Sequence, residues 1–176
     1  MIEAVVLTPA VEADHAEIVE LSNWAYRGTG PQSSWTVESF LEGDRTNVVA
    51  LRADLARAPQ AQILIWRAAN GELQGHCWVE PLQAGVWYLG LLSVRPDRQD
   101  QKLGRRLLAA AEDHARHCGA KRMQMTVINI RATLIAWYER RGYALSREVR
   151  PFPYGDDRFG RPLRDDLSFV VLERQL

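Results

Sequence analysis

The stretch VRPDRQDQKLGRRLL, residues 94–108, decides how the rest of this chain is interpreted. A strand-like run ends at Val94, Pro96 breaks it, and a polar turn leads into a helix that opens with Gly104 and two arginines. The first turn of a helix has unpaired N–H groups and the positive end of the helix dipole, so it can bind a phosphate. Many ordinary strand-to-helix connections contain the same residue types, so both interpretations stay open on this stretch alone.

The size and charge of the chain argue against several classes of protein. With 176 residues, of which 47% are hydrophobic, the sequence predicts a single domain over residues 1–176. The 22 Lys and Arg residues balance 22 Asp and Glu residues without a polybasic tract, which argues against a nucleic-acid or anionic membrane partner. No apolar stretch approaches the roughly 20 residues of a membrane span. Early acidic residues in MIEAVVLTPAVEADHAEIVE are unlike a secretory signal, so we expect a cytoplasmic location.

The cysteines and histidines do not predict a metal site. Cys77 and Cys118 lie far apart in the sequence, which supports neither a disulfide framework nor a CxxC site. His114 and His117 lie one helical turn apart without a third ligand nearby, so we expect a solvated helix face. Cys77 is expected to be a small core residue.

The hydrophobic pattern predicts strands and helices that alternate along the chain. A strand over residues 3–9 precedes a helix that begins near Asp14 and continues to about Tyr26. The further expected elements are one or two short helices over 35–43 and 47–58, strands over 61–68, 73–81 and 86–94, a helix over 101–118, a strand over 121–128, a helix over 131–141, and strands over 143–149 and 167–172. This order indicates an α/β domain with a mixed sheet. The turn at 94–104 would lie at the carboxyl end of a central strand, where such sheets bind ligands.

Two segments of the sequence carry a family resemblance. LLSVRPDRQDQKLGRRLLAAAEDHA (91–115) and MTVINIRATLIAWYERRGYAL (125–145) resemble the GNAT superfamily of acyl-CoA-dependent N-acetyltransferases. The resemblance implies a single-domain fold with a mixed, mostly antiparallel sheet of about seven strands flanked by helices. It also implies acetyl-CoA as co-substrate, with its pyrophosphate held by backbone N–H groups of the turn. The implied cofactor-binding residues are Leu92, Val94, Gln99, Asp100, Gln101, Lys102, Leu103, Gly104, Arg105, Asn129 and Arg131.

The turn departs from the family pattern at one position. Gln99 takes the first place of the motif and Gly104 the last, but Lys102 stands where the first glycine is expected. If Lys102 keeps a compatible backbone, its ammonium group adds charge near the phosphates; if it does not, the loop is distorted and binding is weaker. Neither a GxGxxG nor a GxxxxGK[ST] sequence is present, which argues against a dinucleotide fold and a P-loop.

Asn129 and Arg131 have alternative interpretations at the start of the last predicted helix. Asn129 resembles the family asparagine that contacts pantetheine, but it could simply be the N-cap of the helix. Its distance to Tyr138 is longer than the commonest pattern, which places Arg131 in that register instead.

Tyr138 precedes Gly142 and Tyr143 in the form YxxxGY, and the resemblance implies that it protonates the departing thiolate. A phenol with a pKa near 10 stays protonated at neutral pH and can donate to a thiolate whose acid has a pKa near 8.5. The alternative is that Tyr138 packs in the core, because it shares helical spacing with Leu134 and Ile135.

A general base is harder to assign. The strand YLGLLSV (88–94) contains no carboxylate where many family members have a glutamate. Glu80 is the nearest candidate, and His76 lies on the same face of its strand. Either could act through water, or Glu80 could be a solvated strand-end residue and His76 a half-buried structural one. No His or Asn arrangement identifies Cys77 as a nucleophile, so we expect direct transfer in a ternary complex.

The acceptor is expected to be a primary amine of a small molecule or peptide. The segment RPFPYGDDRFGRPLRDD (150–166) is too long for a plain hairpin, and the resemblance implies that it borders the acceptor side of the cleft. Aromatic walls and two aspartates would suit a small cationic amine. The residues expected to bind it are Trp24, Tyr26, Trp35, Tyr154, Asp156 and Asp157. Alternatively, arginines in the segment could pair with the aspartates and make it a surface lid or a homodimer contact.

Two classes of function remain open from the sequence. The first is an acetyl-CoA-dependent N-acetyltransferase. The second is a non-catalytic module that keeps the acyl-CoA pocket as a sensor or regulatory subunit. Tyr138 favours the enzyme, while Lys102 and the missing strand glutamate leave room for the module.

Overall fold

The computed structural model describes residues 4–176, with the side chains of residues 99 and 100 outside the described part. A seven-stranded sheet has the order β1-β3-β4-β5-β6-β9-β7, and β2 and β8 form a second, two-stranded sheet. The strands of the large sheet are β1 (Leu7–Pro9), β3 (Gln62–Arg67), β4 (Leu73–Pro81), β5 (Val86–Val94), β6 (Arg122–Ile128), β7 (Ala144–Pro151) and β9 (Ser168–Gln175). The helices are α1 (His15–Arg27), α2 (Val48–Arg57), α3 (Leu103–His117) and α4 (Ala132–Glu139).

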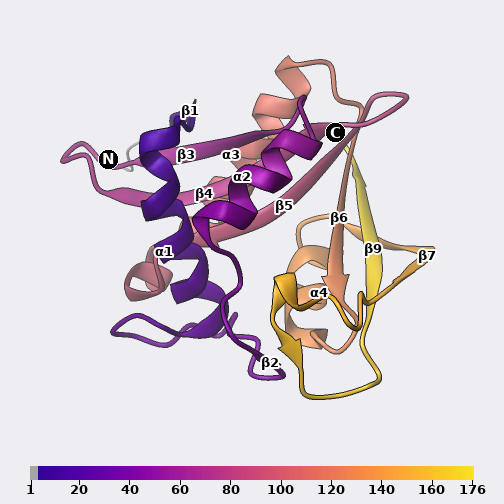
Figure 1. Ribbon diagram of the computed structural model, residues 1–176. Helices are drawn as coiled ribbons and strands as arrows, with labels where there is room; N and C mark the ends of the chain where they lie inside the picture. Colours follow the sequence, from indigo (N-terminus) through magenta and orange to yellow (C-terminus); the bar gives the residue numbers. More distant parts are fainter. Residues whose placement is uncertain (1–3) are drawn as a thin grey trace.

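The large sheet opens in the middle. Its neighbouring strands pair antiparallel except β5 and β6, which are parallel. The parallel pairing joins only Val86–Tyr88 to Arg122–Gln124, after which the two strands diverge and leave two half-sheets, as Figure 1 shows. The α/β fold with a mixed, mostly antiparallel sheet of about seven strands is thus confirmed.

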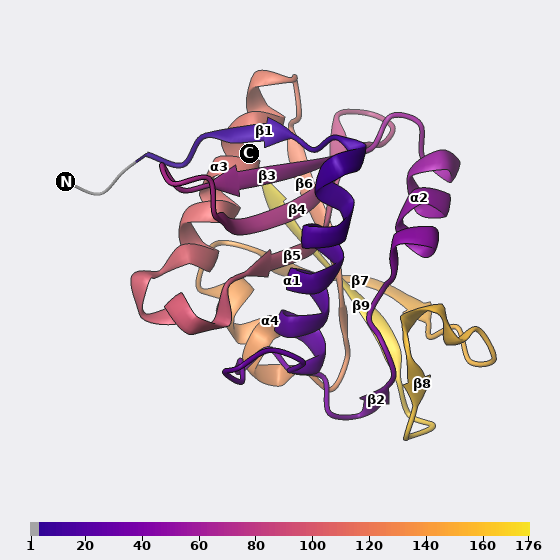
Figure 2. The ribbon, with the colours of Figure 1, turned by 60° about the vertical axis from the view of Figure 1, so that its left-hand side comes forward.

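Helices cover both faces of the half-sheet that contains β3, β4 and β5 (Figure 2). Because side chains alternate along a strand, Ile63 and Ile65 of β3 pack with apolar residues of α1 and α2. Leu64 and Trp66 point the other way, into the core beneath α3. The predicted buried face of α3 is confirmed: Leu103, Leu107, Leu108, Ala111 and Ala115 are all buried. Among the described residues, no helix is long and apolar enough to cross a membrane.

The predicted helix over residues 35–43 is wrong. This stretch forms turns and the short strand β2 (Leu41–Glu42), which pairs with β8 (Arg161–Pro162). β8 lies within the long 150–166 segment, so the segment is attached to the loop after α1. A short strand of this kind depends on a partner distant in the sequence, which local periodicity does not reveal.

Candidate functional site

Strand β5 departs from regular geometry where the half-sheets separate. Leu91 has a φ of 48°, and Leu91 and Leu92 together lie opposite the single residue Cys77 of β4. Such a β-bulge disrupts the local ladder and bends the strand. The Tyr26 hydroxyl donates a hydrogen bond to the Leu92 carbonyl oxygen over 3.2 Å. The bulge therefore connects β5 to α1 beside the opening of the sheet.

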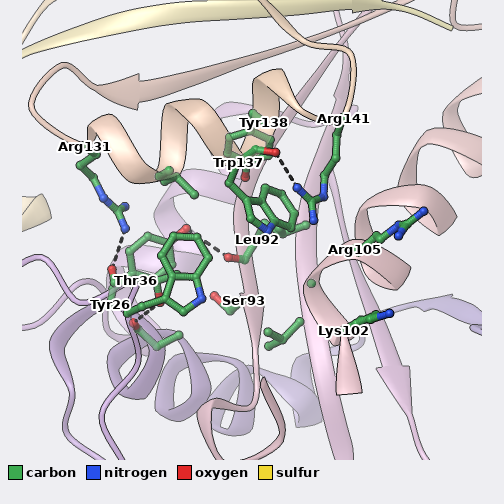
Figure 3. Close-up of a pocket in the computed structure, with 15 residues that line it drawn as sticks. Tyr26, Thr36, Leu92, Ser93, Lys102, Arg105, Arg131, Trp137, Tyr138 and Arg141 are labelled. Carbon is green, nitrogen blue, oxygen red and sulfur yellow. Dashed lines mark hydrogen bonds between the residues drawn. The ribbon is translucent and has the colours of Figure 1, made fainter. Parts of the chain in front are cut away.

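The turn after β5 contains a short 3₁₀ helix, Pro96–Gln101, and reaches α3 through Lys102. Lys102 has φ 57° and ψ 30°, the left-handed conformation that glycine adopts without a Cβ penalty. A non-glycine residue in this conformation carries a cost of about 1–2 kcal/mol. Of the two alternatives for Lys102, the compatible, glycine-like backbone is the one observed. Its side chain lies at the first turn of α3, as Figure 3 shows.

A cavity lies between the end of β5, the first turn of α3 and helix α4, and we call it the α3–α4 cavity (Figure 3). Its walls also include residues of α1 and of the loop that follows α1. The lining residues are Ala25, Tyr26, Trp35, Thr36, Leu92, Ser93, Val94, Lys102, Gly104, Arg105, Arg131, Leu134, Trp137, Tyr138 and Arg141.

Trp137 connects the aromatic and cationic side chains of this cavity. Its ring centroid lies 6.5 Å from that of Trp35 and 5.0 Å from that of Tyr138. The guanidinium carbon of Arg141 lies 3.6 Å from the centroid of the Trp137 ring. A Cβ atom built at Gly104 would lie 3.6 Å from Trp137, which is an ordinary contact. Glycine at position 104 therefore leaves open space beside Trp137, and alanine would fit there.

Positive charge gathers at the α3 end of the α3–α4 cavity. Lys102, Arg105 and Arg141 line it, and within the described part of the chain these three side chains have no ion pair. Burial lowers the pKa of Arg141, and the neighbouring charges of Arg140 and Arg105 lower this pKa further. Cations left without carboxylate partners beside the N-terminus of a helix provide a binding site for an anion.

Tyr138 projects from α4 into the region where the α3–α4 cavity meets a second cavity. The residue is only 6% exposed, and burial raises the pKa of its hydroxyl far above the ordinary value. Among the described residues, this hydroxyl has no hydrogen-bond partner. Tyr138 is therefore a protonated donor that is available to a bound molecule.

The second cavity lies in the opening between β5 and β6 and is bordered by residues 150–153 and by Phe159; we call it the β5–β6 cavity. Its charged and aromatic lining residues are Tyr26, Glu38, Arg45, Tyr88, Arg131, Tyr138, Arg150, Phe152, Phe159 and Phe169. The residues that line both cavities are Tyr26, Leu92, Arg131, Leu134 and Tyr138. A molecule in each cavity could therefore meet its neighbour beside Tyr138.

Most charges of the β5–β6 cavity are neutralised within the protein. The Glu38 carboxylate forms ion pairs with Arg27 at 2.8 Å and with Arg131 at 3.2 Å. Arg150 donates to Glu148 over 2.6 Å. The Arg45 guanidinium instead lies over two aromatic rings, 5.3 Å from the centroid of Tyr26 and 5.3 Å from that of Phe159. In the described part of the chain, no carboxylate pairs with Arg45.

Of the residues predicted for the cofactor, the structure brings six to the α3–α4 cavity: Leu92, Val94, Lys102, Gly104, Arg105 and Arg131. Leu103 is buried in the core beneath α3, and Gln101 is exposed. The side chains of Gln99 and Asp100 lie outside the described part of the structure.

Asn129 lies at the end of β6 and holds the start of β9. Its side-chain amide donates to the carbonyl oxygen of Asp166 over 3.0 Å and accepts from the backbone N–H of Ser168 over 3.0 Å. The alternative interpretation of Asn129 as the N-cap of α4 is wrong, because Arg131 occupies that position and no side chain caps the helix. Asn129 also lines neither cavity.

The two candidate bases lie away from Tyr138. Glu80 accepts a hydrogen bond from the indole N–H of Trp78 over 3.1 Å and lines a neighbouring recess that shares Arg45 and Tyr88 with the β5–β6 cavity. His76 is fully buried, and burial lowers its pKa to about 3. It therefore stays neutral, and the structure brings it to neither cavity.

Only some of the residues predicted to bind the acceptor line the two cavities. Tyr26 lines both cavities, and Trp35 lines the α3–α4 cavity beside Trp137. Trp24 lines neither and donates from its indole nitrogen to the carbonyl oxygen of Gln32 over 2.7 Å.

The three residues of the 150–166 segment that were predicted to bind the acceptor also lie outside both cavities. Tyr154 is 45% exposed and donates to the Arg164 carbonyl oxygen over 3.0 Å. Asp156 pairs with Arg158 at 2.9 Å, and Asp157 is exposed. Neither aspartate nor Tyr154 lines the β5–β6 cavity.

Sequence reasoning missed several residues that the structure brings to the cavities: Thr36, Glu38, Arg45, Trp137 and Arg141. Trp137 and Arg141 flank Tyr138 on the predicted helix, so the helical period could have indicated them. Glu38 lies where a helix over residues 35–43 was wrongly predicted, and Arg45 lies in the loop that follows, so only the tertiary structure shows their positions.

Comparisons with known proteins agree with this geometry. Residues 17–143 match the family model described as "Acetyltransferase (GNAT) family". Over 137 residues the chain is 29% identical to a mycothiol acetyltransferase of Gordonia bronchialis; the match covers 77% of this chain but 42% of that protein. The chain thus spans less than half the length of this relative.

Solved structures show the same fold. The ribosomal-protein-S18-alanine N-acetyltransferase of Escherichia coli aligns with a TM-score of 0.67 and 17% identity, over 97% of this chain and 93% of that one. A protein from Salmonella typhimurium, solved with its cofactor acetyl-CoA, aligns with a TM-score of 0.64 and 21% identity, over 99% and 95% of the two chains.

Proposed function

Because the chain belongs to the GNAT acetyltransferase family, we propose that it transfers an acetyl group from acetyl-CoA to a primary amine. We further propose that the transfer is direct, within a ternary complex, and uses no acyl-enzyme. The observation that carries this proposal is the meeting of two cavities at Tyr138, one of them lined by unpaired cations. The similar solved structures support the fold, whereas the acetyl transfer to an amine is inferred from family membership and from the residues that line the two cavities.

The α3–α4 cavity fits the chemistry of a coenzyme A thioester. Lys102, Arg105 and Arg141 offer positive charge without carboxylate partners, which suits phosphate groups. The backbone N–H groups of the first turn of α3 add fixed donors. Leu92, Val94 and the Trp137 ring would cover the apolar arm. Acetyl-CoA itself supplies the activated acetyl thioester.

Tyr138 acts as the general acid in this proposal. The amine nitrogen forms a bond to the acetyl carbon, the carbon–sulfur bond breaks, and Tyr138 gives its phenolic proton to the leaving sulfur. Its raised pKa keeps the hydroxyl protonated until that step. Tyr138 lines both cavities, which supports this role for its hydroxyl.

Glu80 accepts the proton of the amine through water in this proposal. The recess that it lines shares Arg45 and Tyr88 with the β5–β6 cavity, which supports a route for the proton through water. Glu38 is unsuited to the role, because two guanidinium groups already bind its carboxylate.

Release of free thiol from acetyl-CoA, measured with Ellman's reagent against a panel of primary amines, tests the proposal. Amine-dependent thiol release that is lost in Tyr138→Phe is the expected result. Binding of acetyl-CoA without amine-dependent release from any acceptor would contradict the enzyme and support a non-catalytic acyl-CoA-binding module.

A further inference from the structure

We propose that the acceptor amine carries a carboxylate and that Arg45 binds this carboxylate in the β5–β6 cavity. The proposal rests on the acetyl transfer proposed above and names its acceptor class. The sequence had suggested a cationic amine held by Asp156 and Asp157, but neither aspartate lines this cavity.

The charge of the β5–β6 cavity favours an anionic group. Arg45, Arg131 and Arg150 line it, while Glu38 is the acidic residue among its described lining. The negative charge of Glu38 is already balanced by Arg27 and Arg131, which lie 2.8 Å and 3.2 Å away. A second ammonium group on the acceptor would therefore meet excess positive charge, whereas a carboxylate would be attracted.

Arg45 is the cation that remains available. Arg131 is paired with Glu38, and Arg150 with Glu148. Within the described residues, Arg45 lacks an ion pair, and its planar guanidinium can bind both oxygens of a carboxylate. Binding of a carboxylate to an arginine that is partly buried in a cavity and lacks an ion pair is energetically favourable.

The structure also holds Arg45 in position before any ligand binds. Its backbone N–H donates to the Asn23 side-chain oxygen over 2.7 Å, and the Asn23 amide donates to the Thr46 carbonyl oxygen over 3.0 Å. These bonds attach the loop to α1, and the guanidinium contacts the faces of the Tyr26 and Phe159 rings, each with its centroid 5.3 Å away. Preorganisation of this kind reduces the entropy lost when a ligand binds.

The remaining walls of the cavity define the body of the acceptor. Phe152, Phe159 and Phe169 line it, so the group between amine and carboxylate meets apolar surface. The predicted acceptor class is therefore an amino carboxylate with an apolar side chain or spacer, and the amine points to Tyr138.

Matched sets of acceptors test the proposal. Each set contains an amino carboxylate, its primary amide and the corresponding amine without the carboxyl group; phenylalanine, β-alanine and 5-aminovalerate supply three separations, and spermidine serves as the cationic competitor. We expect kcat/KM to be about tenfold to a hundredfold higher for the carboxylate of the best set than for its amide. Arg45→Met should remove this preference and leave the acetyl-CoA KM near wild type.

Variants of matched chemistry give the controls. Arg164→Met removes an exposed arginine that pairs with Asp166 and lines neither cavity, and it should keep the preference. Arg45→Lys keeps the charge without the planar fork and should retain part of the preference. Equal turnover of carboxylate and amide, or a preference for spermidine, would overturn the proposed carboxylate site while leaving acetyl transfer intact.

A binding measurement separates this inference from the proposed function, because it requires no turnover. Calorimetric titration with 3-phenylpropionate and with its amide uses a carboxylate and a neutral analogue that lack the amine. The acid should bind wild type and Arg164→Met, and bind Arg45→Met at least about tenfold more weakly. Equal affinity of acid and amide for the wild type, or unchanged affinity of the acid for Arg45→Met, would refute the role of Arg45 even if no amine is acetylated.

Discussion

Tyr138 gives the clearest test at the scale of single residues. Tyr138→Phe keeps the ring between Trp137 and Tyr143 and removes only the proton donor. We expect kcat to fall about a hundredfold or more, with the acetyl-CoA KM near wild type, because the donor acts only as the sulfur leaves. Steady-state thiol release measures both parameters. An unchanged kcat would assign Tyr138 to packing alone.

The same hydroxyl has a consequence for the pH profile of the enzyme. Burial raises the pKa of Tyr138 above its ordinary value of 10.0, so the proton-donating form persists as the pH rises. We therefore expect no alkaline fall in kcat between pH 7 and about 10, the pH at which an ordinary phenol is half ionised. The measurement is kcat against pH with a saturating amine. A fall centred below pH 10 that disappears in Tyr138→Phe would contradict this assignment.

Single residues also show what the sequence could reveal. The spacing between Tyr138 and Gly142 indicated Tyr138 as a candidate proton donor, because both residues belong to one local motif. The partner of Asp156 is Arg158, two residues away, yet the sequence left open whether Asp156 binds the acceptor or an arginine of its own segment. Which partner a charged side chain takes depends on the surrounding tertiary structure, so Arg45 could not be selected from the sequence.

At the scale of elements, the first turn of α3 is the predicted phosphate site. Gly104→Asp would bring a negative charge near Lys102, Arg105 and Arg141, so we expect the Kd of coenzyme A to rise at least about tenfold. Gly104→Ala is the matched control, because a Cβ atom there makes only an ordinary 3.6 Å contact with Trp137. Calorimetry measures both. Equal affinity of the Asp variant and wild type would move the phosphate site elsewhere.

Helix α1 is joined to β4 by a buried histidine. The Ser22 hydroxyl donates to the Ile18 carbonyl oxygen over 2.7 Å, so its oxygen must accept from Nε2 of His76, which lies 3.1 Å away. This arrangement assigns the remaining lone pair to Nδ1, which is buried without a partner. The protein therefore holds His76 neutral.

The neutral form of His76 predicts acid destabilisation. Burial lowers its pKa from 6.5 in the unfolded chain to about 3 in the folded one, so its contribution is complete above pH 6.5 and is lost as the pH falls toward 3. The slope can reach about 1.4 kcal/mol per pH unit. Urea unfolding at pH 7, 6, 5 and 4 measures it. His76→Gln should show a shallower slope over this range, and an identical slope would mean that other groups cause the loss.

Elements with a periodic pattern were the predictable part of the fold. The strands β3, β4 and β5 follow from strand-like runs separated by turn residues, the helix α3 follows from an apolar helical face, and the structure confirms them. The short pair β2 and β8 could not be predicted, because Leu41 and Pro162 become neighbours only after the chain has folded. The position of the loop that carries Arg45 could not be predicted either, because it also depends on contacts between residues that are distant in the sequence.

At the scale of the whole molecule, Glu38 connects the two half-sheets. It binds Arg27 at the end of α1 and Arg131 at the start of α4, and its side chain is 5% exposed. Glu38→Gln would leave two buried guanidinium groups without their counter-ion, so we expect the free energy of unfolding to fall by about 3–5 kcal/mol. Urea denaturation measures this loss. Glu42→Gln, which removes an exposed carboxylate paired with Arg161, should cost less than about 1 kcal/mol.

The short parallel contact between β5 and β6 leaves room for a cavity beside the α3–α4 cavity, and the two share part of their walls. The α3–α4 cavity and the β5–β6 cavity each have walls that the other lacks, and the residues that they share include Tyr138. Because each cavity has walls of its own, we expect each reactant to bind and dissociate independently of the other. Initial-rate kinetics should show random order of addition, with the acetylated amine inhibiting competitively against the amine and noncompetitively against acetyl-CoA. Strictly ordered kinetics would mean that one cavity can bind its reactant only after the other cavity is occupied.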